Sequence, residues 1–200
     1  MNNIELNLNN TEKLNIELTL SLDQMHCCDY GFISFQNDNN SIMLYNDSLR
    51  PGMSVLEEVL MDVISGNYTL HSSIDKDIGY IWNIYLNSTS KKTSGLIFNN
   101  DGFWVGDRHL IWTNSGYDYP ITATWLYNND QGEIILEVTP SYKWHFLDPE
   151  PGDEFISYED FMKSYQPILF RTISKEVAQE WLVQAQAILK QIENNIERDR

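Results

Sequence analysis

The chain has 200 residues, of which 42% are hydrophobic and 21% are charged. This balance excludes a disordered chain, because disorder combines low hydrophobicity with high charge. The 29 acidic and 13 basic residues give a net charge of −16, and a surface of this sign repels phosphates and anionic lipid heads, which argues against nucleic-acid and membrane partners.

The first 66 residues predict two hairpins and a helix. Aliphatic residues alternate with polar ones over 4–8 and 14–22, so each strand has one apolar face. A second pair of strands, 30–35 and 41–45, is joined by an Asn- and Asp-rich turn at 36–40. After Pro51-Gly52, a helix of about 12 residues is expected, with Ser54 as its N-cap, Glu57 closing a capping box and Gly66 as its stop.

The middle of the chain predicts strands. Six segments are rich in β-branched and aromatic residues and are separated by short turn signals such as 99–102 and 128–132. Such short intervals favour an antiparallel meander over βαβ units. The predicted strands are 79–86, 95–98, 103–105, 109–112, 121–127 and 133–139.

The C-terminal third predicts an acidic loop and two helices. Residues 148–160 hold six acidic side chains without Lys or Arg, and their two prolines and Gly152 indicate a loop. Ser157 caps a short helix, and an extended piece follows at 168–173. From Ser174 to about residue 193, apolar residues recur at spacings of 3 and 4, which predicts a long amphipathic helix.

These elements predict one α+β domain over residues 1–200, with a helical portion at approximately 155–197. We expect a large, mostly antiparallel sheet with a short helix and a long C-terminal helix packed on one face. Trp181 and Ile188 lie two turns apart on the same face of that helix, so both are expected to be buried against the sheet.

No pattern in the sequence predicts a catalytic residue, a metal site or a cofactor. His26, His71, His109 and His145 lack the helical spacing of metal ligands, and no nucleophile motif accompanies them. Asp75 and Asp77 suggest a calcium loop, but Leu86 stands where such a loop needs a glutamate. An enzyme site assembled in space from dispersed carboxylates, Tyr and His stays open as an alternative.

The N-terminus lacks a basic region followed by an apolar stretch, and no apolar segment is long enough to span a membrane, so we expect a cytoplasmic protein. Cys27 and Cys28 are adjacent, and a bond between them would strain the connecting peptide. They also fall short of the four ligands of a structural zinc site. We expect them to be small, buried or half-buried residues in a reducing compartment.

Two features indicate where a partner would bind. In the run Phe103-Trp104-Val105 one aromatic ring must face away from the other, and an exposed tryptophan such as Trp104 would anchor a partner, although burial in a two-sided sheet stays open. The loop carboxylates have no evident structural role, and one interpretation is that they contact a basic partner. The alternative interpretation is a solvated surface loop, because Asp and Glu are usually exposed. The predicted loop contacts are Asp148, Glu150, Asp153 and Glu154.

The overall build resembles the immunity proteins of bacterial polymorphic-toxin and contact-dependent inhibition systems. The resemblance rests on an acidic, Asn-rich α+β chain with the segment Pro140-Ser-Tyr-Lys-Trp144, an acidic loop and the helix around Trp181. It implies a protein that binds and blocks a cognate toxin domain, many of which are basic nucleases. We therefore expect a non-enzymatic binding protein with a basic protein partner. A structural or scaffold subunit that uses the C-terminal helix is a further alternative.

Overall fold

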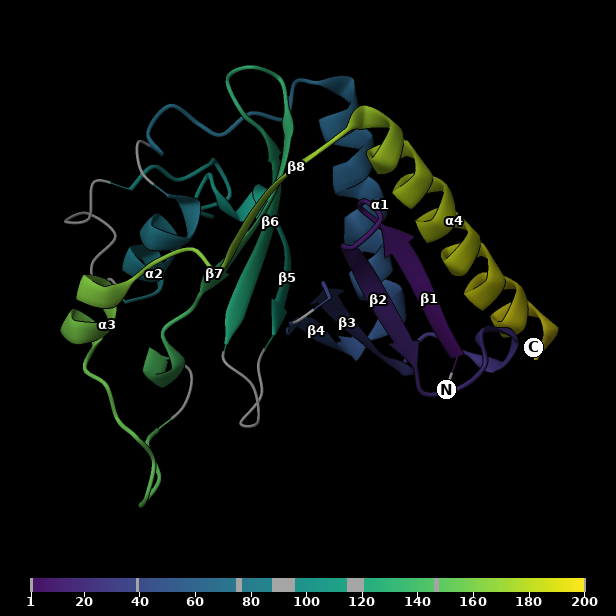
Figure 1. The fold of residues 1–200 in the computed structure, drawn as a ribbon, viewed down its shortest axis with the longest axis horizontal. Coiled ribbons are helices and arrows are strands. Elements are labelled where there is room, and N and C mark those ends of the chain that lie inside the picture. Colours follow the sequence, from purple (N-terminus) through teal and green to yellow (C-terminus); the bar gives the residue numbers. More distant parts are fainter. Residues whose placement is uncertain are drawn as a thin grey trace.

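The computed structural model describes residues 2–38, 40–74, 77–87, 96–114, 121–145 and 148–199. It confirms the α+β class and the antiparallel pairing (Figure 1). The strands form two sheets of four, in the orders β1-β2-β3-β4 and β5-β6-β7-β8, instead of one large sheet. The strands are β1 Asn2–Asn7, β2 Lys13–Leu18, β3 Tyr30–Gln36, β4 Ser41–Ser48, β5 Leu110–Asn114, β6 Thr122–Asn128, β7 Ile134–Pro140 and β8 Leu169–Ile173. The helices are α1 Leu49–Ser65, α2 Ile78–Asn87, α3 Tyr158–Ser164 and α4 Lys175–Arg198.

The first sheet buries one apolar face, as the period-2 pattern predicts. Ile4 pairs with Ile16, and Ile16 pairs in turn with Ile33, so aliphatic side chains from three strands lie side by side. This face packs in one core cluster with α1 and α4. Both predicted hairpins are therefore confirmed.

The second sheet is covered on both faces. Along β6, Trp125 and Tyr127 belong to one apolar cluster and Leu126 to the other. In Figure 1 this sheet stands between α2 on one side and α1 on the other. Burial on both faces explains why β6 and β7 contain almost no exposed residues.

Helix α1 begins five residues before the predicted cap. Its N-cap is Ser48, so the prediction of Ser54 as the N-cap, with Glu57 closing a capping box, was wrong. Gly66 ends the helix as predicted, in the left-handed conformation with φ +81°. Pro51 lies in the first helical turn, where a missing N–H is harmless. Pro51 and Gly52 therefore lie inside the start of the helix, and the helix does not begin after them.

The segment 79–86 is helix α2, and its prediction as a strand was wrong. Asp77 accepts a hydrogen bond from the Tyr80 backbone N–H at 3.0 Å and caps the helix. Ile78 and Trp82, four residues apart, are both buried against the second sheet. Gly79 lets the helix approach closely, because a Cβ there would lie 2.2 Å from Oγ1 of Thr139. The aromatic and β-branched composition suits a buried helix as well as a strand.

Residues 96–105 form a tight turn with little strand character. The two predicted strands meet only in one isolated bridge between Phe98 and Trp104, and residue 95 lies outside the described residues. The predicted turn at 99–102 is present, with Gly102 at φ +83°. The Asn99 side chain accepts hydrogen bonds from the backbone N–H groups of Asp101 and Phe103, and these bonds close the turn beside the bridge.

Helix α4 starts after Ser174, whose hydroxyl accepts a hydrogen bond from the Val177 N–H at 3.2 Å. Trp181 and Ile188 are buried, as predicted. The helix packs along α1 and against β1, at the end of the molecule away from α2 and α3 (Figure 1). None of the helices in the described ranges has the length and apolar character needed to cross a membrane.

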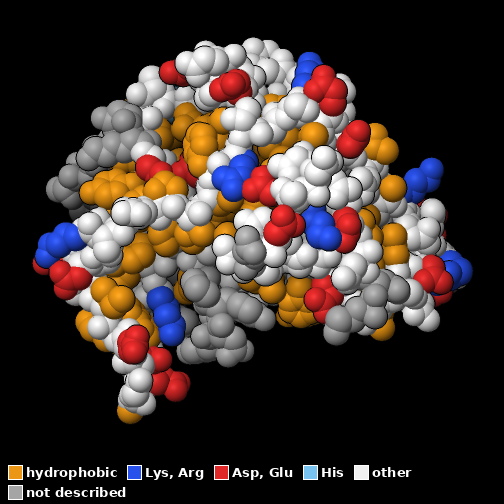
Figure 2. Space-filling model, in the orientation of Figure 1, with side chains coloured by type: hydrophobic (Ala, Val, Ile, Leu, Met, Phe, Trp, Pro, Cys, Tyr) orange, Lys and Arg blue, Asp and Glu red, His pale blue; other side chains and the backbone are white. Residues whose placement is uncertain are grey.

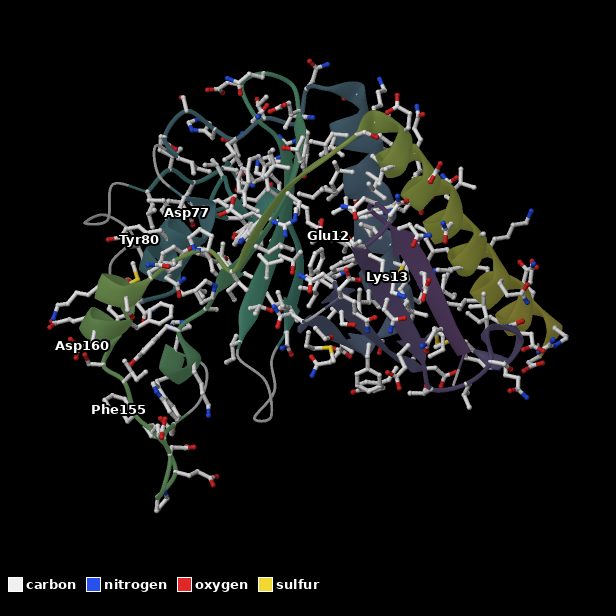
Figure 3. All side chains as sticks on the ribbon, viewed as in Figure 1. Glu12, Lys13, Asp77, Tyr80, Phe155 and Asp160 are labelled. Carbon is white, nitrogen blue, oxygen red and sulfur yellow. The ribbon has the colours of Figure 1, made fainter. Side chains whose placement is uncertain are left out.

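A half-buried ion pair links the turn between β1 and β2 to the second sheet. Arg171 on β8 donates two hydrogen bonds to Oε1 of Glu12, through Nε at 2.9 Å and through its terminal nitrogen at 2.7 Å. The hydrogen bond from Arg171 lowers the pKa of Glu12, whose side chain is only 14% exposed. Figure 3 shows Glu12 between the first sheet and β8, at the junction of the two halves of the chain.

Candidate functional site

A cleft of about 790 Å³ lies beside the second sheet. Its walls come from the loop after α1, from the turn at 99–105 and from the short helical turn Asp107–His109. A volume of this size is within the range of small-molecule sites. The cleft therefore has to be considered as a binding or catalytic site.

Two titratable side chains of the cleft have perturbed pKa values. His109 is 1% exposed and lies against the Tyr68 ring, with ring centroids 4.6 Å apart. Burial, with a smaller contribution from Arg108, lowers the pKa of His109 to about 3, so its ring is neutral at physiological pH. Burial raises the pKa of Asp107 to about 6.

These groups do not form a catalytic arrangement. Both ring nitrogens of His109 are enclosed and have no hydrogen-bond partner among the described residues, so the ring cannot reach a substrate proton without moving. His71 Nδ1 lies 2.8 Å from Ser73 Oγ, but it also accepts the Ser73 backbone N–H, which makes this pair a local turn. Among the described residues, no carboxylate orients that histidine. The cleft does not favour the enzyme alternative.

A second titratable cluster lies under α2, and its Tyr127 ring lies 6.3 Å from the ring of His109. Glu137 on β7 is 2% exposed, and its Oε2 accepts a hydrogen bond from the Tyr127 hydroxyl at 2.6 Å. The Asp77 carboxyl lies against Glu137 and accepts a hydrogen bond from the Tyr165 hydroxyl. Asp77 and Tyr80 are labelled at the start of α2 in Figure 3. Burial and the Asp77 carboxyl raise the pKa of Glu137 to about 8.

A proton on this acid pair satisfies its hydrogen bonds. Oε1 of Glu137 is buried and has no donor among the described residues when both carboxyls are ionised. A proton held between the Glu137 and Asp77 carboxyls supplies the missing hydrogen bond and removes one of two neighbouring charges. The pair lines none of the described cavities, so we assign it a structural role in joining α2 to β7.

The predicted partner residues of the loop lie on a projecting arm, which we define as residues 148–156. Figure 1 shows this arm extending away from both sheets, between the 3-10 turn Lys143–His145 and α3. Asp148, Glu150 and Glu154 are exposed and have no ion pair with the described residues. Figure 2 shows acidic side chains at the end of the arm.

Asp153 differs from the other three acids because it has a structural duty. Its Oδ2 accepts a hydrogen bond from the Glu150 N–H at 2.8 Å, and Gly152 takes the left-handed conformation that closes the turn, with φ +106°. Its other oxygen lies 3.8 Å from Lys143 Nζ. The expectation that all four carboxylates lack a structural role was therefore wrong for Asp153.

Trp104 is buried, so it is not available as a surface anchor. It is 1% exposed and packs against Trp82, Tyr85 and Trp125. The neighbouring Phe103 is the ring that faces outward, with 59% of its surface exposed. One aromatic ring of the run 103–105 faces outward, as predicted, but this ring belongs to Phe103 and not to Trp104.

The arm exposes two large apolar side chains, Phe155 and Ile156, which were not among the predicted partner residues. They are 58% and 54% exposed, and the Phe155 ring lies 5.8 Å from the ring of Trp144. The Tyr142 hydroxyl donates a hydrogen bond to the Ile156 carbonyl at 3.0 Å and holds the base of the arm. The signal that could have found them is the apolar pair directly after an acidic loop, since loops rarely expose two large apolar side chains together without a function.

A shallow apolar hollow of about 300 Å³ adjoins the base of the arm, and Trp144, Glu154, Ile156 and Phe161 contribute to its wall. Among the described residues, no group of three or more His, Cys, Asp or Glu side chains is placed to hold a metal ion.

Comparison of the chain with protein-family models, curated proteins and solved structures found no match.

Proposed function

We propose that the protein is a non-enzymatic binding protein whose arm contacts a basic protein partner. The observation that supports this most directly is the placement of exposed Phe155 and Ile156 on a segment that projects from the body. Three acidic side chains that have no ion pair with the described residues lie beside them. Buried aromatic anchors surrounded by a polar rim are typical of protein interfaces.

The charges and the apolar residues would act at different stages of binding. The acidic arm, on a chain of net charge −16, steers a cationic partner and raises the association rate. Phe155 and Ile156 then become buried and slow dissociation. Figure 3 shows Phe155 on the arm between its tip and α3. A partner bound there could also reach the apolar hollow at the base of the arm.

The resemblance to immunity proteins suggests the partner's identity. We propose that the partner is a toxin domain with a cationic active site, and that the acidic arm occupies this site. A basic nuclease meets both requirements, because its phosphate-binding surface carries the charge that the arm complements.

Neutralising the three acids of the arm that have no ion pair with the described residues should reduce partner capture at moderate salt. The test variant carries Asp148→Asn, Glu150→Gln and Glu154→Gln, and retains Asp153 because it closes the turn. Exposed charges contribute only about 0.2–1 kcal/mol each, so the association rate and its salt dependence should fall most. The measurement is affinity capture from the cells that express the protein, followed by binding kinetics with the captured partner at two salt concentrations.

The matched control carries Glu180→Gln, Glu193→Gln and Glu197→Gln on α4, which change the net charge equally at the opposite end of the molecule. A protein captured equally by the parent and by this control, but captured less by the arm variant, is the expected partner. A Phe155→Ala variant should bind it with an increased dissociation rate. Equal capture by the arm variant and the control would contradict the proposal.

A further inference from the structure

The turn at residues 26–29 places two thiols together on the surface. The Asp29 N–H donates to the His26 carbonyl at 3.3 Å, and the Asp29 carboxylate accepts the His26 N–H at 2.7 Å. Cys27 and Cys28 occupy the two central positions, and their Sγ atoms lie 3.3 Å apart. Both cysteines are exposed, so the expectation of buried or half-buried residues was wrong, because the turn points both side chains away from the core.

The fold holds this turn in place. Asn195 near the end of α4 is 1% exposed, and its Nδ2 donates to the carbonyls of Leu22 and Met25, each at 2.9 Å. The His26 Nε2 also lies 3.2 Å from an Asp199 carboxylate oxygen. Contacts made in the folded protein therefore hold the backbone of the turn, so a ligand of the two thiols does not have to order that backbone.

The sulfur separation selects the geometry of a bound centre. With metal–sulfur bonds of about 2.3 Å, an S–M–S angle near 90° spans about 3.3 Å, a tetrahedral angle about 3.8 Å and a linear arrangement about 4.6 Å. The observed 3.3 Å matches the right-angled case, which is typical of a pyramidal trivalent centre. Structural zinc would need two further ligands. A direct disulfide is strained, because adjacent Cα atoms are about 3.8 Å apart, below the usual range of about 4.4–6.8 Å.

We propose that Cys27 and Cys28 form a chelating site for a single trivalent arsenic centre. In the reaction, each thiol replaces one hydroxyl group on arsenic(III), so two As–S bonds form and two As–O bonds break. The two thiol protons leave with the hydroxyl groups as two water molecules, and no atom changes oxidation state. This site is independent of the arm and of the function proposed for it.

The probe for this site is phenylarsine oxide, whose hydrated form carries two hydroxyl groups on arsenic. The chain has only these two cysteines, so the fully reduced, full-length protein should gain the mass of one phenylarsenic group and no more. The adduct should persist in millimolar glutathione, a monothiol, and be reversed by dithiothreitol, a dithiol. Chelation raises the effective concentration of the second thiol and should strengthen binding by about 100-fold or more.

Cys27→Ser and Cys28→Ser are the test variants, and each should lose the adduct in glutathione. Both positions are exposed, so the variants should keep the circular dichroism spectrum and melting temperature of the parent. The proposal would be overturned if either variant retained the adduct in glutathione. It would also be overturned if the parent protein gained two phenylarsenic groups, or if glutathione removed the adduct from the parent protein.

Discussion

Replacing Trp181 with alanine is expected to lower the free energy of unfolding by about 3–5 kcal/mol. The ring is 1% exposed in the cluster where α4 meets α1 and β1, and its Nε1 donates a hydrogen bond to the Asn7 carbonyl at 2.9 Å. The change removes this bond and leaves a cavity that the surrounding helices fill only in part. For a chain of this length, the loss corresponds to a fall in melting temperature of roughly 6–20 °C.

The control is Val183→Ala on the same helix, where the side chain is 65% exposed. Its melting temperature should stay unchanged or rise slightly, because alanine favours a helix more than valine does. Thermal unfolding followed by circular dichroism measures both variants. Equal melting temperatures for the two variants would show that α4 contributes little to the fold, contrary to the packing seen here.

The second large effect is a dependence of stability on pH that Glu137→Gln should remove. The pKa of Glu137 is about 8 in the folded protein against an ordinary 4.5, so the folded chain retains a proton that the unfolded chain has lost. The contribution of Glu137 to the free energy of unfolding therefore has its full value below about pH 4.5 and falls as the pH rises to about 8. At 1.36 kcal/mol per pH unit the ceiling is about 5 kcal/mol, and we expect a loss of a few kcal/mol.

Glutamine imitates the protonated acid at this position. Its amide N–H can donate to the Asp77 carboxylate, and its carbonyl can still accept from the Tyr127 hydroxyl. The parent protein should therefore lose stability relative to Glu137→Gln between pH 5 and pH 8.5. Urea unfolding at several pH values measures the difference, and Asp77→Asn should give the same flattening while it preserves the cap of α2.

The matched control for this experiment is Glu180→Gln, which removes an exposed charge from α4. The free energy of unfolding of Glu180→Gln should depend on pH as that of the parent does, because both proteins keep Glu137 and the repulsion among the other acidic residues. Parallel curves for the parent and Glu137→Gln would mean that Glu137 is ionised in the folded protein, and the shared proton would be excluded. A less stable Glu137→Gln at every pH would point to the same conclusion.

Local chemistry in the sequence predicted many of the elements. Alternation in β1 to β4 and the 3- and 4-residue spacing in α4 reflect which face of each element is buried, and burial is what selects those patterns. Caps such as Ser157 and Ser174, and stops such as Gly66, act through their own backbone and are visible without tertiary contacts. Acidity and the acidic loop are likewise properties of composition.

Segments buried on all sides were harder to assign. Helix α2 has aromatic and β-branched residues that fit either a helix or a strand, and the close approach of Gly79 to β7 is a contact between residues 60 positions apart. The division of the strands into two sheets also depends on α1, which packs between them. Periodicity within one segment carries no information on which other segment covers it.

The site residues show the same division. The sequence alone placed Asp148, Glu150 and Glu154 in an acidic loop, because charge and turn residues are local properties. Only the tertiary structure decided that Trp104 is buried, that Phe155 is exposed and that Asp77 meets Glu137. Exposure and the meeting of two distant carboxyls depend on how separate elements pack, and that packing is set by the whole chain at once.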